Sequence, residues 1–387
     1  MNPFPDSANR VWVSAAALKS NYRLMRSVLP PATPLLAMVK ADAYGHGMVA
    51  AAGAFAEAGC RHFGVAELPE AVRLREYLYA AGIDAEILVM AGLLPGQEEY
   101  FPRYGLSAAV FSLDSARLLS AAGAAAGRRV LVHIKVDCGM TRLGIMPEET
   151  LAFTEAIEQL SGIELAGIFA HFPEADSPEK PSNRQVRDNF AVASAAFTTV
   201  LSAAKGLPPR HHLANSAGIL NQRMAHFDMA RSGIALYGYA PDGIPAHAVA
   251  GGEALQPAMR FVSRVLQVKD VAAGCGVSYG HTFVTARPSR LAVLPVGYED
   301  GYQRALSNKA SVLIHGRRAP IVGRICMNLC LADVTEIAAV ATGDEVVLLG
   351  CQGDECVSAD ELAALAGTIS YELLCMIGNN NQREMVA

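Results

Sequence analysis

A lysine directly after an apolar run near the start of the chain is the first residue whose position indicates chemistry. Residues 35–39 are all apolar and predict a buried strand, Lys40 follows at once, and Gly45 and Gly47 predict a turn. In a β/α barrel, the C-terminal ends of the strands open into the active site. Lysine forms Schiff bases with carbonyl cofactors. The alternative for Lys40 is an ordinary position on a rim loop, and the spacing alone leaves both open.

Two further side chains follow predicted strands. Arg142 comes shortly after residues 130–136, and His171 follows residues 164–170. An arginine at a barrel mouth suits a carboxylate-bearing substrate, because a guanidinium can bind a carboxylate through two parallel hydrogen bonds. A histidine at a strand end is suited to pack on a planar cofactor. The alternatives are a surface ion pair for Arg142 and a hydrogen-bonded core position for His171.

Small and hydroxyl residues accompany the last two strands of this half. Ser216 comes after residues 211–214, and Gly233 lies within residues 229–236. Barrels of this kind commonly bind phosphate near strands seven and eight. A glycine also lets a backbone approach a phosphate closely. These two positions therefore predict a phosphate site.

Two unusual stretches lie in the second half of the chain. Tyr279 stands between Ser278 and Gly280, which is odd for a packed strand and indicates an exposed tyrosine. Met327 lies in the stretch Gly323-Arg324-Ile325-Cys326-Met327-Asn328. Ordinary hairpin chemistry is the alternative for both.

The elements that must position these residues alternate in type over the first ~230 residues, the pattern of parallel strands joined by helices. The predicted strands are residues 35–39, 62–66, 86–90, 108–111, 130–136, 164–170, 211–214 and 229–236. The predicted helices are residues 15–29, 48–58, 67–81 and 112–125. We therefore predict an α/β fold with an N-terminal (β/α)8 TIM barrel.

The pattern changes after residue 241. Residues 242–256 are rich in Gly, Pro and Ala and predict a linker, and Ser358 with Glu361 predicts the capping box of a helix over residues 358–366. We predict a C-terminal all-β domain over residues 242–387 and a barrel domain over residues 1–241, with residues 1–13 a candidate to pair with the C-terminal domain. The short β-type runs are residues 261–271, 291–296, 311–314, 319–322, 331–334 and 345–349.

Composition limits the class of protein. The chain has 387 residues, 52% of them hydrophobic and 18% charged, with a net charge of −5. A chain this long has enough apolar residues for two cores. It has no basic run that would indicate nucleic acid and no apolar segment long enough to span a membrane. The first six residues lack the pattern of a signal peptide.

The eight cysteines predict neither a metal site nor a secreted disulfide framework. None forms a C-x-x-C pair, and the histidines do not cluster with them at zinc spacing. In a chain of this length we expect reduced, mostly buried thiols in a cytoplasmic protein.

The motifs together resemble the alanine racemases, PLP-dependent (pyridoxal 5'-phosphate-dependent) enzymes of fold-type III, along essentially the whole chain. The sequence Val39-Lys40-Ala41-Asp42-Ala43-Tyr44-Gly45-His46-Gly47 is similar to that family's PLP-lysine signature. The same order of landmarks continues through Met140-Thr141-Arg142-Leu143-Gly144, His171-Phe172, Asn215-Ser216, Arg231, Ser278-Tyr279-Gly280, Cys326-Met327 and Ile369-Ser370-Tyr371-Glu372.

The resemblance implies a racemase that interconverts L- and D-alanine and supplies D-alanine for peptidoglycan. Lys40 would hold PLP and act as one base. Tyr279 would be the opposite base and would reach into the partner's barrel, which implies a homodimer with shared sites. Two bases on opposite faces invert a centre by removing a proton on one side and returning one on the other. A phenol is ordinarily protonated at neutral pH, so positive charge would be needed nearby.

The resemblance also implies cofactor and substrate contacts. His171 would lie against the pyridine ring, and Arg142 would contact the phenolic oxygen and help Met327 to bind the substrate carboxylate. Arg231 would face the pyridine nitrogen and leave it unprotonated, which weakens PLP as an electron sink and disfavours side reactions. Lys135 matches a position that is carbamylated in some members, where it steadies the arginine at 142. The phosphate would be held by Tyr44, Ser216, Gly233, Ile234 and Tyr371.

Three positions depart from the family's pattern. Asn328 replaces the usual Asp after Cys-Met, which removes a charge near the expected substrate entry. Ser232 replaces a common Pro. The end of the chain, Gly378-Asn379-Asn380-Asn381-Gln382-Arg383, lacks the usual Arg-Val-Pro-Arg run.

Other functions remain open at this point. Asn328 favours a racemase of broader range that includes serine, whereas Tyr371 beside Tyr279 would leave room for little more than a methyl group. A decarboxylase of the same fold type would have an acidic residue in place of Arg231. A non-catalytic PLP-binding protein would resemble only the first half and would leave the last ~145 residues unexplained.

Overall fold

The computed structural model describes residues 7–201, 210–241 and 253–387. The predicted linker lies largely outside these residues, as do the first six residues. The chain divides into two compact units. We call Leu18–Ala43 with Ala51–Gln256 the barrel unit, and the residues up to Ala17 with Tyr44–Ala50 and Pro257–Ala387 the sheet unit.

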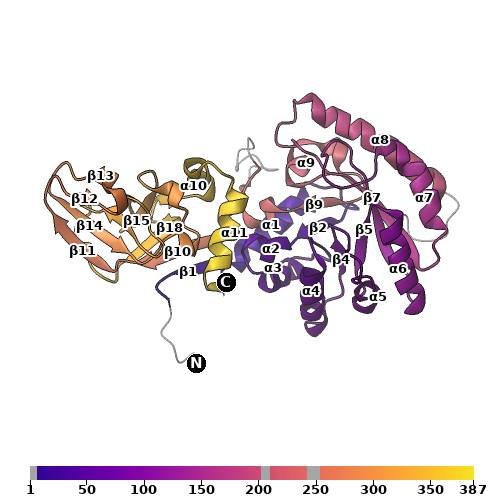
Figure 1. Ribbon diagram of the computed structural model, residues 1–387, viewed down its shortest axis with the longest axis horizontal. Helices are drawn as coiled ribbons and strands as arrows, with labels where there is room; N and C mark the ends of the chain where they lie inside the picture. Colours follow the sequence, from indigo (N-terminus) through magenta and orange to yellow (C-terminus); the bar gives the residue numbers. More distant parts are fainter. Residues whose placement is uncertain (1–6, 202–209, 242–252) are drawn as a thin grey trace. The chain divides into compact units, whose positions relative to one another are not determined.

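The barrel unit is built on eight parallel strands in the order β8-β7-β6-β5-β4-β3-β2-β9, a nearly closed barrel (Figure 1). This confirms the predicted barrel. The strands are β2 (Leu35–Met38), β3 (His62–Val65), β4 (Glu86–Val89), β5 (Ser107–Val110), β6 (Val130–Lys135), β7 (Ile163–Phe169), β8 (Arg210–His212) and β9 (Ala230–Ser232). The last strand is shorter than predicted, because Ile234–Tyr237 forms a 3-10 turn.

The central strands of this barrel are largely buried, as expected for parallel strands covered by helices. Phe63 and Val65 of β3 and Ile87 and Val89 of β4 are all fully buried. The helical segments are α1 (Ala15–Ser27), α2 (Lys40–Tyr44), α3 (Met48–Glu57), α4 (Leu68–Ala80), α5 (Tyr100–Tyr104), α6 (Leu113–Ala125), α7 (Thr150–Glu158), α8 (Pro181–Leu201) and α9 (Ser216–Asn221), with 3-10 turns at η1 (Pro147–Glu149), η2 (Arg223–Ala225) and η3 (Ile234–Tyr237).

The sheet unit contains a seven-stranded sheet in the order β16-β15-β18-β10-β1-β20, with β19 paired to β18. The first strand of the chain, β1, pairs antiparallel with β10 and parallel with β20. A three-stranded sheet, β11-β14-β17, and a hairpin, β12-β13, complete it. The strands are β1 (Arg10–Ser14), β10 (Met259–Arg264), β11 (Gln267–Val271), β12 (Gly276–Val277), β13 (Phe283–Val284), β14 (Ser289–Leu294), β15 (Ser311–Ile314), β16 (Arg317–Pro320), β17 (Cys330–Asp333), β18 (Glu345–Gln352), β19 (Glu355–Val357) and β20 (Arg383–Val386).

The predicted C-terminal β domain is confirmed, and two helices accompany its sheets. These are α10 (Ala359–Ala366) and α11 (Ser370–Asn380), with 3-10 turns at η5 (Tyr279–His281), η6 (Tyr298–Asp300) and η7 (Arg304–Leu306). The backbone N–H of Glu361 donates to Ser358 Oγ at 3.0 Å, so α10 begins at the predicted cap. The single run predicted over 261–271 is two strands, β10 and β11.

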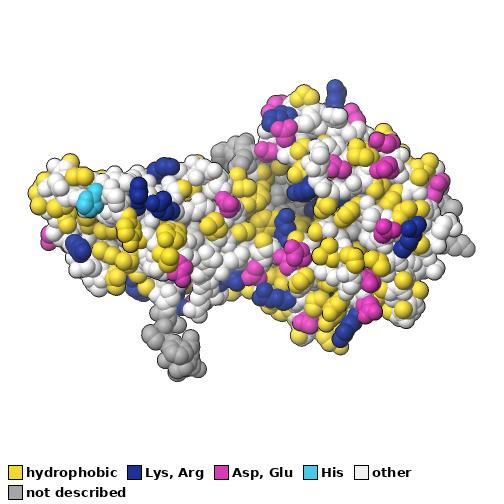
Figure 2. All heavy atoms as spheres, viewed as in Figure 1, with side chains coloured by type: hydrophobic (Ala, Val, Ile, Leu, Met, Phe, Trp, Pro, Cys, Tyr) yellow, Lys and Arg dark blue, Asp and Glu magenta, His cyan; other side chains and the backbone are white. Residues whose placement is uncertain are grey.

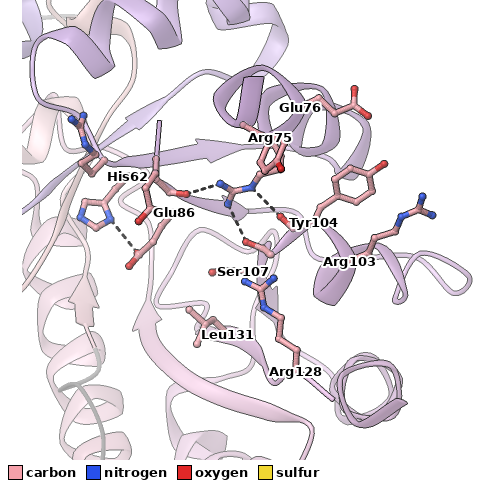
Figure 3. A pocket seen from close by; sticks show the side chains of 14 residues that line it. His62, Arg75, Glu76, Glu86, Arg103, Tyr104, Ser107, Arg128 and Leu131 are labelled. Atoms are coloured by element: carbon pink, nitrogen blue, oxygen red, sulfur yellow. Dashed lines mark hydrogen bonds and ion pairs between the residues drawn. The ribbon is translucent and has the colours of Figure 1, made fainter. Parts of the chain in front are cut away.

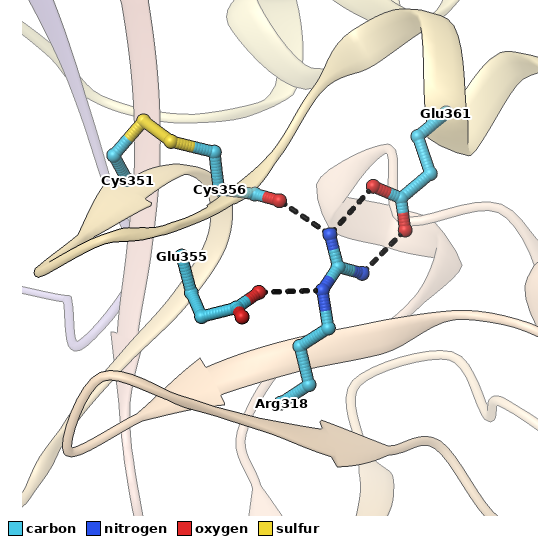
Figure 4. The surroundings of a disulfide bond; sticks show 5 residues. All are labelled: Arg318, Cys351, Glu355, Cys356 and Glu361. Carbon is cyan, nitrogen blue, oxygen red and sulfur yellow. Dashed lines mark hydrogen bonds and ion pairs between the residues drawn. A yellow bond between two sulfur atoms is a disulfide. The ribbon is translucent and has the colours of Figure 1, made fainter.

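One cysteine pair corrects the expectation of reduced thiols. Cys351 and Cys356 face each other in the antiparallel β18–β19 pair, with their Cα atoms 4.1 Å apart, and form a disulfide. Arg318 binds the carboxylates of Glu355 and Glu361 and the carbonyl oxygen of Cys356, so it links this hairpin to α10 (Figure 4). The other six cysteines are free thiols, three of them buried.

Surface composition and helix length complete the description. On the face of the barrel unit in Figure 2, Lys and Arg side chains lie scattered among Asp and Glu. Among the described residues, no single helix has both the length and the apolar character to cross a membrane, although α10 and α11, bent by 105° at their junction, meet that test of length and composition as a pair. The same residues contain no group of three or more His, Cys, Asp or Glu arranged to hold a metal ion.

Candidate active site

Lys40 stands at the C-terminal end of β2, where a parallel barrel places its active site. All four residues of β2 are buried, and Val39 continues the pairing by donating its N–H to the carbonyl oxygen of Gly64 at 2.9 Å. Lys40 itself is half-buried. The predicted position at the end of an apolar strand is therefore the one that the structure shows.

The four residues after Lys40 form a left-handed turn. Ala41, Asp42, Ala43 and Tyr44 all have φ between 50° and 58°. Such a conformation costs an L-residue roughly 1–2 kcal/mol, so four in succession need strong support from their surroundings. The sequence predicted a turn here, but its left-handed form was not predicted.

Glu70, near the start of α4, supports this turn. One oxygen of its carboxylate accepts the N–H of Ala41 at 2.7 Å, and the other accepts the N–H of Ala66 at 2.8 Å. Arg73, one helical turn further along α4, forms an ion pair with Asp42 at 3.3 Å. Helix α4 therefore fixes the backbone that follows Lys40.

The end of the turn packs within the sheet unit. Gly45 has φ 80°, and a Cβ there would lie 2.4 Å from the carbonyl oxygen of Leu374 in α11, so only glycine fits. The rings of Tyr44 and Tyr371 lie 6.1 Å apart between centroids. Burial raises the pKa of Tyr44, which therefore keeps its phenolic proton and can donate a hydrogen bond.

Arg231, on β9, is buried and held by other barrel residues. Its Nη1 donates to the carbonyl oxygen of His212 at 2.9 Å, and its Nη2 donates to the carbonyl oxygens of Ala170 at 2.8 Å and Leu213 at 3.1 Å. Burial lowers the pKa of Arg231 to about 9, so the guanidinium stays charged at neutral pH. Its Nε–H has no hydrogen-bond partner among the described residues.

Two buried histidines, His212 and His133, continue the hydrogen-bond network of Arg231. Nη1 of Arg231 also donates to Nδ1 of His212 at 3.0 Å, and Nε2 of His212 lies 3.0 Å from Nδ1 of His133. Burial lowers the pKa of both histidines, so both are neutral at pH 7. Since Nδ1 of His212 accepts a hydrogen bond from Arg231, we assign the ring proton of His212 to Nε2.

Four cations act on His171, which follows β7. Burial lowers the pKa of His171 well below its usual value, and the charges of Arg231, Lys135, Arg142 and Lys40 lower it further. These groups come from β2, β6 and β9 or the loops after them, so their positive charges gather at one end of the barrel. Such a concentration of cations favours an anionic ligand.

Lys135, the last residue of β6, is buried among these cations. Its Nζ lies 4.6 Å from the centre of the Phe169 ring. Burial, together with the charges of Arg231 and Arg142, lowers the pKa of Lys135 to about 7. The amine is therefore neutral in a large fraction of molecules at physiological pH.

Asp137 shapes the loop that carries Arg142. Its carboxylate accepts the backbone N–H of Gly139, Met140 and Thr141 at 2.8–3.0 Å through one oxygen, and the N–H of Arg142 at 2.8 Å through the other. These bonds lower the pKa of Asp137, which stays ionised. The side chain of Arg142 is exposed.

The predicted phosphate residues of the barrel unit lie together after β8 and β9. The hydroxyl of Ser216 accepts the N–H of Gly233 at 2.9 Å and lies 3.2 Å from the hydroxyl of Ser232. Ile234 follows directly and is buried. Ser232, a departure from the family's pattern, therefore adds a hydroxyl to this group.

Tyr279 and Met327 lie on the surface of the sheet unit. Tyr279 is 71% exposed and Met327 is 54% exposed. Ser278, with φ 59°, is held in place by its hydroxyl, which donates to the carbonyl oxygen of Arg324 at 2.6 Å. A Cβ at position 280 would lie 3.2 Å from the Arg324 guanidinium. Tyr279 is therefore presented to solvent by a turn with a fixed backbone.

The other residues that depart from the family's pattern form side-chain hydrogen bonds. Asn328 donates its side-chain N–H to the carboxylate of Glu299, whereas an Asp at this position would repel it. In the atypical C-terminal segment, Asn380 and Asn381 donate to the carbonyl oxygens of Glu299 and Asp300 at 2.9 and 2.8 Å.

Sequence reasoning missed the residues that support this site. Glu70, Asp137 and His212 each hold another residue's backbone or side chain in place. Glu70 had a signal, because Glu67 and Glu70 have the spacing of a capping box, and Asp137 precedes a Gly-containing turn. His212 had none, since its contact with Arg231 arises only when β8 and β9 come together.

The barrel residues fit PLP. A neutral His171, a charged Arg231 whose Nε–H is unused, and a group of cations at the end of β2 match a planar ring with a nitrogen acceptor and anionic substituents. Lys40 is the lysine at that strand end.

Both halves of the chain match models of known protein families. Residues 13–241 match the model of the alanine racemase N-terminal domain, and residues 258–385 match that of the C-terminal domain. A protein named alanine racemase from Syntrophobacter fumaroxidans is 44% identical over 370 residues, which is 96% of this chain and 95% of that protein.

Solved structures agree over nearly the full length. Alanine racemase from D-cycloserine-producing Streptomyces lavendulae has a TM-score of 0.90 at 33% identity and covers 99% of this chain and 98% of its own. Alanine racemase from Bartonella henselae, with covalently bound pyridoxal phosphate, has a TM-score of 0.84 at 30% identity and covers 99% of this chain and 100% of its own.

Proposed function

The chain belongs to the alanine racemase family, and on that premise we propose that it interconverts L- and D-alanine with PLP bound at Lys40. The observation that supports this best is the buried Arg231, which is fixed by the barrel and has one N–H left to donate. An arginine at this place distinguishes a racemase from a decarboxylase of the same fold type.

The proposed mechanism assigns each step to residues of this chain. When bound, PLP withdraws electrons from the substrate and so acidifies its α-hydrogen. Lys40 removes or returns the proton on one face, and Tyr279 of the partner subunit does so on the other. Arg231 would donate to the ring nitrogen of bound PLP and, because it keeps its own proton, would not protonate that nitrogen.

The remaining contacts are part of the same proposal. Arg142, whose loop is held by Asp137, would bind the phenolic oxygen of PLP and, with Met327, the substrate carboxylate, and His171 would pack on the ring. Residues 1–241 and 242–387 are the two domains, and the enzyme works as a cytoplasmic homodimer that supplies D-alanine for peptidoglycan. The phosphate ligands are Tyr44, Ser216, Gly233, Ile234 and Tyr371.

The substrate range follows from one side chain. We propose alanine over serine because Tyr371 carries a bulky phenol where related serine racemases have a smaller polar residue. Asn328 favours a broader substrate range only because it lacks the negative charge of the family's usual Asp. A carboxylate is nevertheless present beside it, because Asn328 binds Glu299.

The test compares two lysine variants. Lys40→Ala is expected to lose both the visible absorbance of bound PLP and racemisation of L-alanine. Lys19→Ala, which removes a half-buried lysine paired with Glu57 at 3.1 Å, is expected to keep both. A panel of L-alanine, L-serine and larger amino acids checks the range.

Two outcomes would contradict the proposal. A yellow protein that racemises none of the panel would be a PLP-binding protein without catalysis. Turnover of serine equal to that of alanine would show that Tyr371 does not restrict the side chain.

A further inference from the structure

A second polar cavity lies at the opposite end of the barrel from Lys40. It has a volume of about 780 Å³, within the range of small-molecule sites. His62, Glu86 and Ser107 line it, and each is the first residue of its strand, β3, β4 or β5. Lys40 lies just after the C-terminal end of β2, a strand parallel to these three, so the cavity and Lys40 lie at opposite ends of the barrel.

Four arginines line this cavity without a carboxylate partner. They are Arg61, Arg75, Arg103 and Arg128. Among the described residues none of them forms an ion pair. Instead Arg61 and Arg128 donate to backbone carbonyl oxygens, and Arg103 lies over the ring of Tyr104. Hydrogen bonds to carbonyl groups do not neutralise a guanidinium, so the positive charge remains available to a ligand.

Two of these guanidiniums converge at Gly105. Arg75 is half-buried and donates to the carbonyl oxygens of Tyr104, Ala85 and Gly105 at 2.9–3.1 Å, which fixes its plane. The guanidinium of Arg128 lies 2.7 Å from the place that a Cβ at position 105 would take. Gly105, with φ 61°, therefore allows two like charges to meet at one wall (Figure 3).

Ser107 adds an unused hydroxyl to the same wall. The residue is only 5% exposed, yet its Oγ has no hydrogen-bond partner among the described residues. Figure 3 shows it beside the Arg128 guanidinium. This oxygen is not among the fully buried unpartnered atoms of the described residues, so the hydroxyl stays accessible to a ligand.

The acidic residues of the cavity leave this wall open. Glu86 is bound by Arg210 on one side and by His62 at 3.0 Å on the other. Asp84 and Glu76 are exposed and form no ion pair among the described residues, although the charge of Asp84 acts on Arg75. The acids therefore do not occupy the donors of Arg75, Arg128 and Ser107.

We propose that this cavity is a binding site for a small molecule that bears a phosphate group. Guanidiniums form paired hydrogen bonds with phosphate oxygens, and a dianion matches two unpaired guanidiniums better than a monocarboxylate does. The cavity is larger than a phosphate ion alone. The inference does not depend on the proposed racemase activity.

The experiment measures binding to the PLP-loaded protein, so that the phosphate site of the cofactor is already filled. Inorganic phosphate, glycerol 3-phosphate and malonate are titrated by calorimetry at low ionic strength. The variants are Arg128→Ala and Ser107→Ala. The control is Arg129→Ala, which removes the neighbouring arginine that pairs with Glu164 at 2.9 Å and does not line the cavity.

We expect one saturable phosphate site per chain, with Arg128→Ala weakening it about tenfold or more and Arg129→Ala leaving it within about twofold. Ser107→Ala is expected to weaken it less. Tighter binding of glycerol 3-phosphate than of inorganic phosphate identifies an organic phosphate as the ligand, and the reverse order identifies free phosphate. Absence of saturable binding, equal loss in both arginine variants, or a preference for malonate would overturn the proposal. Thermal unfolding of each variant checks that it is folded.

Discussion

At the scale of single residues, burial among other positive charges sets the protonation state of Lys135. Its amine has no acidic partner among the described residues, and its pKa is lowered to about 7. Above this pH the folded state holds fewer protons on Lys135 than the unfolded chain, whose lysine keeps its proton to the usual pKa of about 10.4. Lys135 therefore contributes a stability that rises with pH between these two values.

The neutral amine of Lys135 makes carbamylation by carbon dioxide a specific prediction. Only the unprotonated amine reacts, so the carbamate is expected to form as the pH rises through about 7 and to be lost below it. The measurement is ¹³C NMR of the protein in ¹³C-bicarbonate, with Lys135→Met as the control. A carbamate signal that persists in Lys135→Met would contradict the assignment.

Tyr279 carries a second prediction at this scale. Tyr279→Phe removes only the hydroxyl of an exposed residue, so bound PLP is expected to keep its colour. Racemisation from one enantiomer should fall more severely than from the other, because only one face loses its base. Initial rates from L- and D-alanine are compared with those of Tyr100→Phe, another exposed tyrosine. Near-wild-type rates from both enantiomers would remove Tyr279 from the mechanism.

At the scale of elements, periodicity predicted the strands better than the helices. The barrel strands are short apolar runs, and seven of the eight lie close to the predicted places. Helices α7, α8 and α11 were not predicted. The Cys351–Cys356 disulfide was not predicted, because these cysteines lack the C-x-x-C spacing. They face each other across a hairpin whose two-residue turn is Gly353-Asp354.

The left-handed turn after Lys40 could not be predicted from its sequence, because Ala41, Asp42 and Ala43 have no intrinsic preference for positive φ. Its form depends on a tertiary hydrogen bond to Glu70. We predict that Glu70→Ala lowers PLP affinity and kcat by about tenfold or more, since a hydrogen bond to a charged group contributes roughly 1.5–3 kcal/mol. Cofactor titration and racemisation rates measure this, with the exposed Glu155→Ala as the control. Unchanged PLP affinity would show that the turn holds its form without Glu70.

At the scale of the whole molecule, the residues proposed for the racemase site belong to two compact units of the chain. Lys40, Arg142, His171 and Arg231 belong to the first, and Tyr279 to the second. The family motifs point to all of these residues in the sequence, because each stands in a short and specific run. Pattern alone could not show which copy of the chain supplies Tyr279, since that depends on assembly.

The most direct test of the central claim is complementation between two inactive or weakened variants. Lys40→Ala and Tyr279→Phe homodimers are purified, mixed, and exchanged under mild denaturation. If each site takes Lys40 from one subunit and Tyr279 from its partner, a heterodimer contains one intact site and one doubly altered site. The mixture should then recover up to about a quarter of wild-type racemase activity, as expected for random exchange within a two-fold dimer. Activity no higher than the mean of the two parents, in a mixture shown by mass spectrometry to contain heterodimers, would contradict a shared site.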